Sequence, residues 1–318
     1  MDSNIISTQG LIYDYPVKRA LFGIDVAIKR GGITALVGPN GAGKTTLIRC
    51  LVGLSAPTAG QVVFDGHDVA EAPRLAHRDM GYLPDFYGLY DDMSVRALLE
   101  HGAEMRGMTR RLARDRAHEA AGRLDIEDRL DHKVSSLSRG LAQRAAIARA
   151  IIHAPKFVVL DEPAAGLDPE ARMRLSALFR RLQGDGMTLL VSSHILAELE
   201  DYCTDMIIIQ GGQLVEDVTG EGLRPRRVSV ELTGLDPRLD AILRAADGVD
   251  EVEIEGAAAR FAFVGDNDAL AGLLRRLVDA GLAVTRFAER AERFQDTYRR
   301  AVAGRDNGDG NGGRDGAA

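Results

Sequence analysis

Short apolar runs alternate with amphipathic stretches along the first two thirds of the chain. Five runs have the length and composition of buried strands, and they lie at residues 32–38, 60–66, 157–160, 188–193 and 206–210. Strand-like runs that alternate with helical patterns are typical of an α/β fold. Residues 1–222 are therefore predicted to form one α/β domain.

A charged, helix-rich region interrupts these strands between residues 85 and 155. Three amphipathic patterns fall at 94–107, 110–124 and 140–155, and each has the 3.6-residue period of a helix. Strand character returns directly afterwards. The pattern predicts a helical subdomain inserted into the α/β domain.

The composition changes at residues 219–227, which read as a linker. The segment 223–303 then alternates strand, helix, hairpin, helix and strand patterns, with a last helix expected at 293–302. This β-α-β-β-α-β order predicts a small α+β domain of the ferredoxin-like type. Residues 304–318 are rich in glycine and aspartate, and we expect them to be disordered.

Charge and composition narrow the function classes. The 318 residues carry a net charge of −7 without a basic patch, so nucleic acid is not an expected partner. The only cysteines, Cys50 and Cys203, have neither metal-ligand spacing nor a disulfide framework. The N-terminus lacks the features of a signal peptide, and no apolar run approaches the roughly 20 residues needed to cross a bilayer. A soluble chain in a reducing compartment is expected.

The segment GPNGAGKTT at 38–46 predicts a phosphate-binding loop between a strand and a helix. Its glycines allow backbone N–H groups to surround a polyphosphate at a helix N-terminus. The lysine reaches the β- and γ-phosphates, and the first threonine offers its hydroxyl to Mg²⁺. The predicted ATP-binding residues here are Gly38, Pro39, Asn40, Gly41, Ala42, Gly43, Lys44, Thr45 and Thr46.

Two adjacent carboxylates, Asp161 and Glu162, follow the apolar run FVVL. Buried carboxylates are costly without a cation, and the Mg²⁺ of a bound nucleotide would supply one. We expect the strand that ends at Asp161 to lie beside the strand of the phosphate-binding loop. Asp161 then binds the metal, and Glu162 activates the attacking water as a catalytic base.

Taken together, these motifs resemble the ATP-binding cassette (ABC) ATPases over residues 5–222. The stretch HKVSSLSRGLAQRAAIARAI resembles the signature motif of that family and its helix, just upstream of FVVLDEP. AGLDP resembles the D-loop with Asp168, and LLVSSHILAELE places His194 where the family keeps a histidine near the γ-phosphate. Tyr15 matches the aromatic residue that stacks on adenine.

The resemblance implies a P-loop ATPase cassette that hydrolyses ATP with Mg²⁺, with Lys44, Glu162 and His194 as catalytic residues. Two cassettes are expected to pair head to tail, so that Ser138 and Gly140 of one contact the γ-phosphate bound by the other. A separate transmembrane permease is the implied partner, and the segment 85–90 with the helical insert would receive it. The separate-chain exporters with a C-terminal accessory domain are the nearest pattern, working as a homodimer on the cytoplasmic face of the membrane.

Two positions depart from the family pattern. The signature usually reads Leu-Ser-Gly-Gly-Gln, and here Arg139 replaces its first glycine and Leu141 its glutamine. Arg139 can add a cation at this position or face solvent, which is usual for arginine. Asp85 stands at the Q-loop glutamine, where it is a candidate Mg²⁺ ligand with Thr45 and Asp161.

Two other function classes remain open from the sequence. One is a soluble ABC ATPase without a transport role, although the chain lacks the second cassette or long coiled coil of those proteins. The other is a regulatory cassette that hydrolyses ATP weakly, which Asp85 and Arg139 favour. A Mg²⁺-dependent ATPase assay separates this regulatory cassette from the exporter subunit.

Overall fold

The computed structural model of the chain describes residues 3–86, 88–218, 226–265, 267–290 and 298. Two compact units divide the chain between Thr219 and Gly220. The helix expected at 293–302, apart from Tyr298, and the tail at 304–318 lie outside the described residues, as does most of the linker at 219–227. Each unit is considered by itself.

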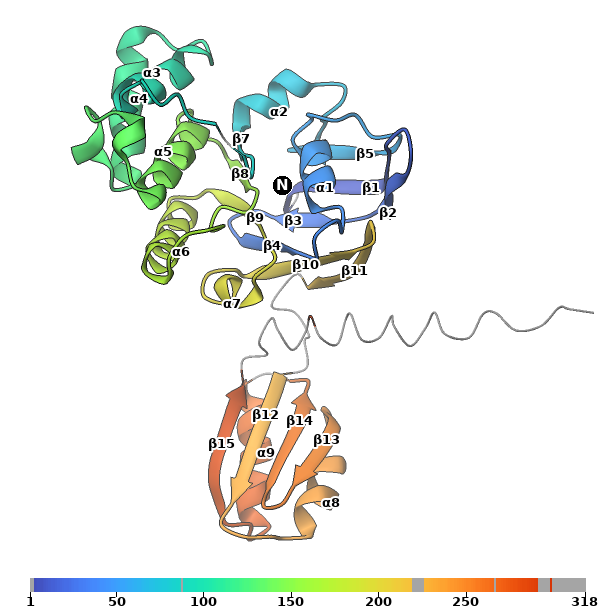
Figure 1. Ribbon diagram of the computed structural model, residues 1–318. Helices are drawn as coiled ribbons and strands as arrows, with labels where there is room; N and C mark the ends of the chain where they lie inside the picture. Colours follow the sequence, from blue (N-terminus) through green and yellow to red (C-terminus); the bar gives the residue numbers. More distant parts are fainter. Residues whose placement is uncertain (1–2, 87, 219–225, 266, 291–297, 299–318) are drawn as a thin grey trace, which may run out of the picture. The chain divides into compact units, whose positions relative to one another are not determined.

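A six-stranded sheet forms the centre of the first unit (Figure 1). Its strand order is β11-β10-β4-β9-β8-β7, and all neighbours are parallel except β10 and β11. The strands span Ile33–Val37 (β4), Met80–Leu83 (β7), Phe157–Leu160 (β8), Thr188–Ser193 (β9), Asp205–Gln210 (β10) and Gln213–Val218 (β11). Every residue of β4, β8 and β9 is buried, which explains why the sequence shows them as continuous apolar runs.

This strand order corrects one expectation. The strand that ends at Asp161, β8, does not lie beside the phosphate-loop strand β4, because β9 lies between them. The error arose because periodicity identifies strands and carries no information about their lateral order. The intervening strand supplies Ser192, which becomes part of the site described below.

A second, antiparallel sheet adds to the α/β domain that the sequence predicts. Its path is β2-β1-β5-β6, and β3 also pairs with β1. The strands span Asn4–Asp14 (β1), Arg19–Ile24 (β2), Ala27–Lys29 (β3), Ala59–Phe64 (β5) and His67–Asp68 (β6). Helix α1 (Lys44–Leu51) contributes Leu47, Ile48 and Leu51 to the core cluster that joins both sheets. The helix after the phosphate loop is thereby fixed in place by apolar packing.

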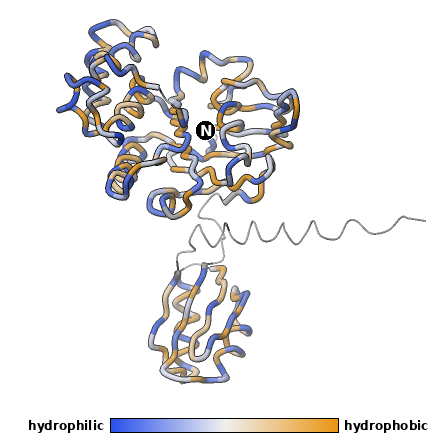
Figure 2. Tube along the Cα trace, in the orientation of Figure 1, coloured by the Kyte–Doolittle hydropathy of each residue, from blue (hydrophilic) through white to orange (hydrophobic). Residues whose placement is uncertain are grey.

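Three helices lie between β7 and β8 and form an insert. They are α3 (Val95–Glu104), α4 (Arg110–Arg123) and α5 (Arg139–Ile151), and hydrophobic and hydrophilic residues alternate along them (Figure 2). Serine or threonine caps the start of each helix. Shorter elements complete this unit, namely α2 (Pro73–Asp79), the 3₁₀ turns Glu127–Arg129 and Val134–Ser136, α6 (Pro169–Gly184) and α7 (Leu196–Leu199).

The second unit has a four-stranded antiparallel sheet with the order β13-β14-β12-β15. Its elements follow as β12 (Arg226–Leu232), α8 (Arg238–Arg244), β13 (Val249–Glu255), β14 (Ala258–Phe263), α9 (Asn267–Asp279) and β15 (Val284–Arg290). Apolar residues of both helices and the sheet form a core cluster of their own, with Val230, Leu243, Phe261 and Leu277 almost fully buried. The unit therefore has the hydrophobic core expected of a separate domain.

Candidate nucleotide site

The phosphate loop follows β4 and leads directly into α1. Gly38 is required by close packing, since a Cβ atom there would lie 2.2 Å from the carbonyl oxygen of Ile209. Gly43 has a φ of +106°, in the region that favours glycine. Lys44 is 7% exposed, and its Nζ donates to the carbonyl oxygen of Gly38 at 2.7 Å. The ammonium group is therefore held over the loop, where a polyphosphate would lie.

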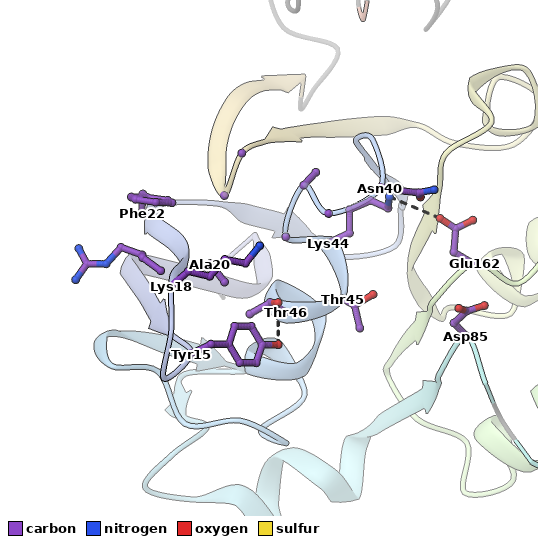
Figure 3. Close-up of a pocket in the computed structure, with 16 residues that line it drawn as sticks. Tyr15, Lys18, Ala20, Phe22, Asn40, Lys44, Thr45, Thr46, Asp85 and Glu162 are labelled. Atoms are coloured by element: carbon purple, nitrogen blue, oxygen red, sulfur yellow. Dashed lines mark hydrogen bonds and ion pairs between the residues drawn. The ribbon is translucent and has the colours of Figure 1, made fainter.

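A cavity of about 490 Å³ opens over this loop (Figure 3). It brings together most of the predicted nucleotide-binding residues, from Tyr15 and the loop positions 40–46 to Asp85 and Glu162. Tyr15 lies at one end of the cavity and the two carboxylates lie at the other. This spacing gives an aromatic surface for a base and a separate charged end for phosphates.

Tyr15 is 39% exposed and held from two sides. Its hydroxyl lies 3.3 Å from Oγ1 of Thr46, and the ring of Tyr13 packs edge-on at a centroid distance of 5.0 Å. The ring is thus fixed while part of its surface stays accessible. An aromatic ring in this setting can stack on a nucleobase.

Asp161 lies beneath the charged end of the cavity and is 1% exposed. Its carboxylate accepts a hydrogen bond from Ser192 Oγ at 2.5 Å and another from Thr45 Oγ1 at 3.0 Å. Burial raises the pKa of this carboxyl; the two hydrogen bonds oppose that effect, and the charges of Asp85 and Glu162 add to it. A buried carboxylate with this balance favours a nearby cation.

The oxygen groups at this end suit magnesium. Thr45, Asp161 and Asp85 offer one hydroxyl and two carboxylates, the ligand types that Mg²⁺ prefers. Within the described residues, no three acidic, histidine or cysteine side chains form a metal cluster on their own. Protein sites for Mg²⁺ commonly have one or two carboxylates and rely on substrate phosphates for the rest.

Glu162 adopts a left-handed backbone conformation, with a φ of 49°. Its backbone N–H donates to Ser192 Oγ at 2.9 Å, which supports this unusual conformation. Its Oε1 lies 3.7 Å from Lys44 Nζ, and its Oε2 lies 2.8 Å from Nδ1 of His194. The carboxylate is therefore oriented from both sides at the edge of the cavity.

Ser138 and Gly140 lie apart from this cavity. They line a second cavity of about 230 Å³ at the start of α5, next to the segment 166–168. Ser138 caps α5 by accepting from Leu141 N–H at 3.4 Å. Within one chain, the structure does not bring these two residues to the cavity around Lys44.

Several residues in or near the cavity did not come from the sequence motifs. Ser192 connects Asp161 with the backbone of Glu162, and the two consecutive serines before His194 on a buried strand were the available signal. The cavity is lined as well by Lys18 of the β1–β2 turn, by Arg19, Ala20 and Phe22 of β2, and by Gly211 and Gly212 of the β10–β11 turn. No motif marks those positions, because their proximity depends on the fold.

Comparison with known proteins places these features in a family. The family model described as ABC transporter matches residues 21–165. The daunorubicin resistance ATP-binding protein DrrA3 of Streptomyces coeruleorubidus is 30% identical over 94% of this chain and 96% of its own length. The Nod factor export ATP-binding protein I of Burkholderia orbicola is 32% identical over 90% of this chain and 93% of that protein.

Solved structures show the same cassette. CbiO1 of Clostridium perfringens, described as part of the ABC transporter complex cbiONQ, matches with a TM-score of 0.64 and 29% identity. That match covers 68% of this chain and 89% of CbiO1. The ADP conformation of MJ1267, an ATP-binding cassette of an ABC transporter, matches with a TM-score of 0.63 over 69% of this chain and 92% of that one.

The chain belongs to the ABC transporter family, as its motifs predicted, and it is an ATP-binding subunit of such a transporter. The cassette fold is likewise confirmed. Among the helices in the described part of the chain, none is both long and apolar enough to span a membrane.

Proposed function

We propose that this subunit hydrolyses ATP and that the reaction powers export through a separate permease. The main support is the arrangement of Glu162 between Lys44 and His194 at the charged end of the cavity. A carboxylate held by two cationic or hydrogen-bonding partners next to a phosphate loop is suited to orient and deprotonate a water molecule.

In the proposed reaction, Glu162 accepts a proton from the water whose oxygen attacks the γ-phosphorus. The bond between that phosphorus and the β,γ-bridging oxygen breaks, and the products are ADP and phosphate. Lys44 exchanges its carbonyl partner at Gly38 for phosphate oxygens and offsets their charge. His194 keeps the carboxylate of Glu162 in place through Nδ1.

Thr45, Asp161 and Asp85 would hold Mg²⁺, which supplies charge neutralisation of the β- and γ-phosphates when bound. Asp161 and Thr45 already share a hydrogen bond, so the side chains are close without large rearrangement. Tyr15 stacks on the adenine at the other end of the cavity.

The active form in this proposal is a head-to-tail homodimer. Ser138 and Gly140 line a cavity of their own, at the N-terminus of a 13-residue helix. The N–H groups and dipole at such a terminus favour an anion, here the γ-phosphate bound by the partner. Both nucleotides would then lie between the two subunits, and hydrolysis would let the subunits separate.

The permease is proposed to dock on the segment 85–90 and the helical insert. Phe86 is 91% exposed and Tyr90 is 59% exposed, although both are large aromatic side chains. Exposed aromatic residues at one site are typical of protein interfaces. The relatives named for drug resistance and Nod factor export support export as the direction, with the subunit attached to the cytoplasmic face of the membrane.

A Mg²⁺-dependent ATPase assay tests this proposal, with Glu162→Gln as the key variant. We expect the substitution to lower the turnover by roughly 10²-fold or more, because the proton acceptor is lost. With ATP, the same variant is expected to accumulate as a dimer in size-exclusion chromatography. Glu104→Gln serves as the control. It removes the same charge from an exposed position on α3, and its turnover should match that of the wild type.

The second candidate is the regulatory cassette, which the carboxylate at position 85 and the arginine at position 139 favour. In that case the wild type turns over ATP no faster than Glu162→Gln. Such a result would contradict the hydrolytic proposal and leave the nucleotide-binding site itself in place.

A further inference from the structure

Arg139, the departure from the family signature, lies directly against the D-loop segment (residues 165–169). Its Nη1 donates to the carbonyl oxygen of Gly166 at 3.1 Å. A Cβ atom on Gly166 would lie 2.4 Å from Nη1 and 2.7 Å from Cζ of the same guanidinium. The guanidinium therefore lies against the α-carbon of Gly166, whose φ of +68° favours glycine at this position.

The start of α5 also lies near the first turn of α6, and both line the second cavity. A Cβ atom on Gly140 would reach ordinary van der Waals distance, 3.5 Å, from the Cβ of Ala171. Ala171 lies in the first turn of α6, which Asp168 caps by accepting from Ala171 N–H at 2.9 Å. The start of α5 thus contacts the D-loop through Arg139 and lies close to the helix that follows it.

The D-loop begins close to the catalytic carboxylate. Ala165 N–H donates to the carbonyl oxygen of Glu162 at 3.1 Å, and Leu167 N–H donates to that of Ala164 at 3.2 Å. Residues 162–167 therefore form consecutive hydrogen-bonded turns, and Leu167 is only 6% exposed. Gly166 lies within these turns, which begin at the backbone of Glu162.

Arg139 differs from the other arginines of the second cavity in the kind of partner that it contacts. Arg174 forms an ion pair with Glu170, and Arg144 lies 4.0 Å from Asp125. Among the residues that the structure describes, Arg139 has no carboxylate within ion-pair distance, and its guanidinium donates to the backbone of Gly166. Its contact with the D-loop is thus not a by-product of an ion pair.

We propose that Arg139 is a positioning residue that couples the two nucleotide sites of the dimer. This inference rests on the proposed function, in which the start of α5 contacts the nucleotide of the partner subunit. Arg139 connects that surface to the D-loop and, through the turns at 162–167, to Glu162 of the same chain. Contact with the partner's nucleotide then orders Glu162 for hydrolysis at its own site.

The test compares Arg139→Ala with two other variants of the full chain. Arg139→Lys keeps a charged donor, and Arg174→Ala removes an equal charge from the same cavity without touching Gly166. We expect Arg139→Ala to lower kcat about tenfold, because the substitution removes one charge-assisted hydrogen bond. The KM for ATP should change less than about twofold. The Hill coefficient for ATP should fall towards 1, and Arg139→Lys should restore part of both losses.

Hydrogen exchange in the nucleotide-free subunit tests the positioning role without relying on catalysis. Arg139→Ala should speed amide exchange in the segment 162–168 by about tenfold, and Arg174→Ala should leave it unchanged. If Arg139→Ala keeps the wild-type exchange rate and Hill coefficient, the coupling role is wrong, even where ATP hydrolysis is normal. If the wild type itself fails to hydrolyse ATP, the proposed function fails, and the exchange measurement still decides whether Arg139 positions the D-loop.

Discussion

At the residue scale, the site depends on a small number of polar groups that hold each other in place. Ser192 Oγ donates to Asp161 and accepts from the backbone of Glu162, so a single hydroxyl fixes both acidic residues. His194 and Lys44 contact opposite oxygens of Glu162. Motifs in the sequence predicted Lys44, Asp161, Glu162 and His194 as site residues. The role of Ser192 depends on the position of β9 between β4 and β8, which no motif indicates.

Tyr15 provides a prediction at this scale. Replacing it with alanine should weaken ATP binding about tenfold, because stacking of a base on an aromatic ring contributes roughly 1–3 kcal/mol. Tyr15→Phe keeps the ring and loses only the contact with Thr46, so it should bind within about twofold of the wild type. Titration with a fluorescent ATP analogue measures both. Equal affinity of the alanine variant would show that the adenine lies elsewhere.

At the element scale, the helical insert is joined to the parallel sheet by specific side chains. Arg106, just after α3, donates to the carbonyl oxygen of His77 in α2 at 2.8 Å. His153, just after α5, has its Nε2 2.8 Å from the carbonyl oxygen of Met80, where β7 begins. Nδ1 of His153 is buried without a partner among the described residues. The position of the insert therefore depends partly on a titratable side chain.

This contact predicts a pH dependence of stability. Burial, with the nearby charge of Arg106 adding to it, lowers the pKa of His153 from 6.5 to about 4, while Asp79 and Met80 oppose the shift. A depressed pKa means that the stability contribution is present above pH 6.5 and is lost as the pH falls towards 4, since the unfolded chain binds the proton first. Between pH 7.5 and 5, the wild type should lose about 1–2 kcal/mol more than His153→Gln.

Urea unfolding at the two pH values measures this difference. Glutamine can keep a donor near Met80 and does not titrate, so other acid-sensitive groups affect both proteins equally. His118→Gln is a suitable control, because His118 lies exposed on α4. Parallel loss of stability in the wild type and His153→Gln would contradict the assigned role of His153.

At the scale of the whole molecule, each unit has its own core cluster. Every residue of the nucleotide cavity lies in the first unit. Docking to a permease is expected to involve the first unit as well, through the exposed aromatic residues after β7.

Cysteine crosslinking to the permease tests that docking surface. Phe86→Cys and Tyr90→Cys should each form a crosslink in membranes that contain both proteins. Met173→Cys, on α6 and with an exposure between those of Phe86 and Tyr90, should not. Burial raises the pKa of the native thiols of Cys50 and Cys203, so their background reaction is slow. Crosslinks from Met173→Cys alone would move the interface away from the segment 85–90.

The amino-acid sequence by itself determined the elements and their chemistry. Continuous apolar runs identified β4, β8 and β9 because those strands are fully buried, and the phosphate loop was recognisable because its glycines and lysine are neighbours in the chain. Local patterns of this kind depend only on residues close in sequence.

Tertiary structure alone decided the order of the strands and the contacts between distant segments. The insertion of β9, the place of Ser192 beside Asp161, and the contact of Arg139 with Gly166 join residues that lie 27 or more positions apart. Such contacts arise from the packing of several elements at once, which no single stretch of sequence encodes. The chemical groups of the site were readable from the chain, and their connections required the fold.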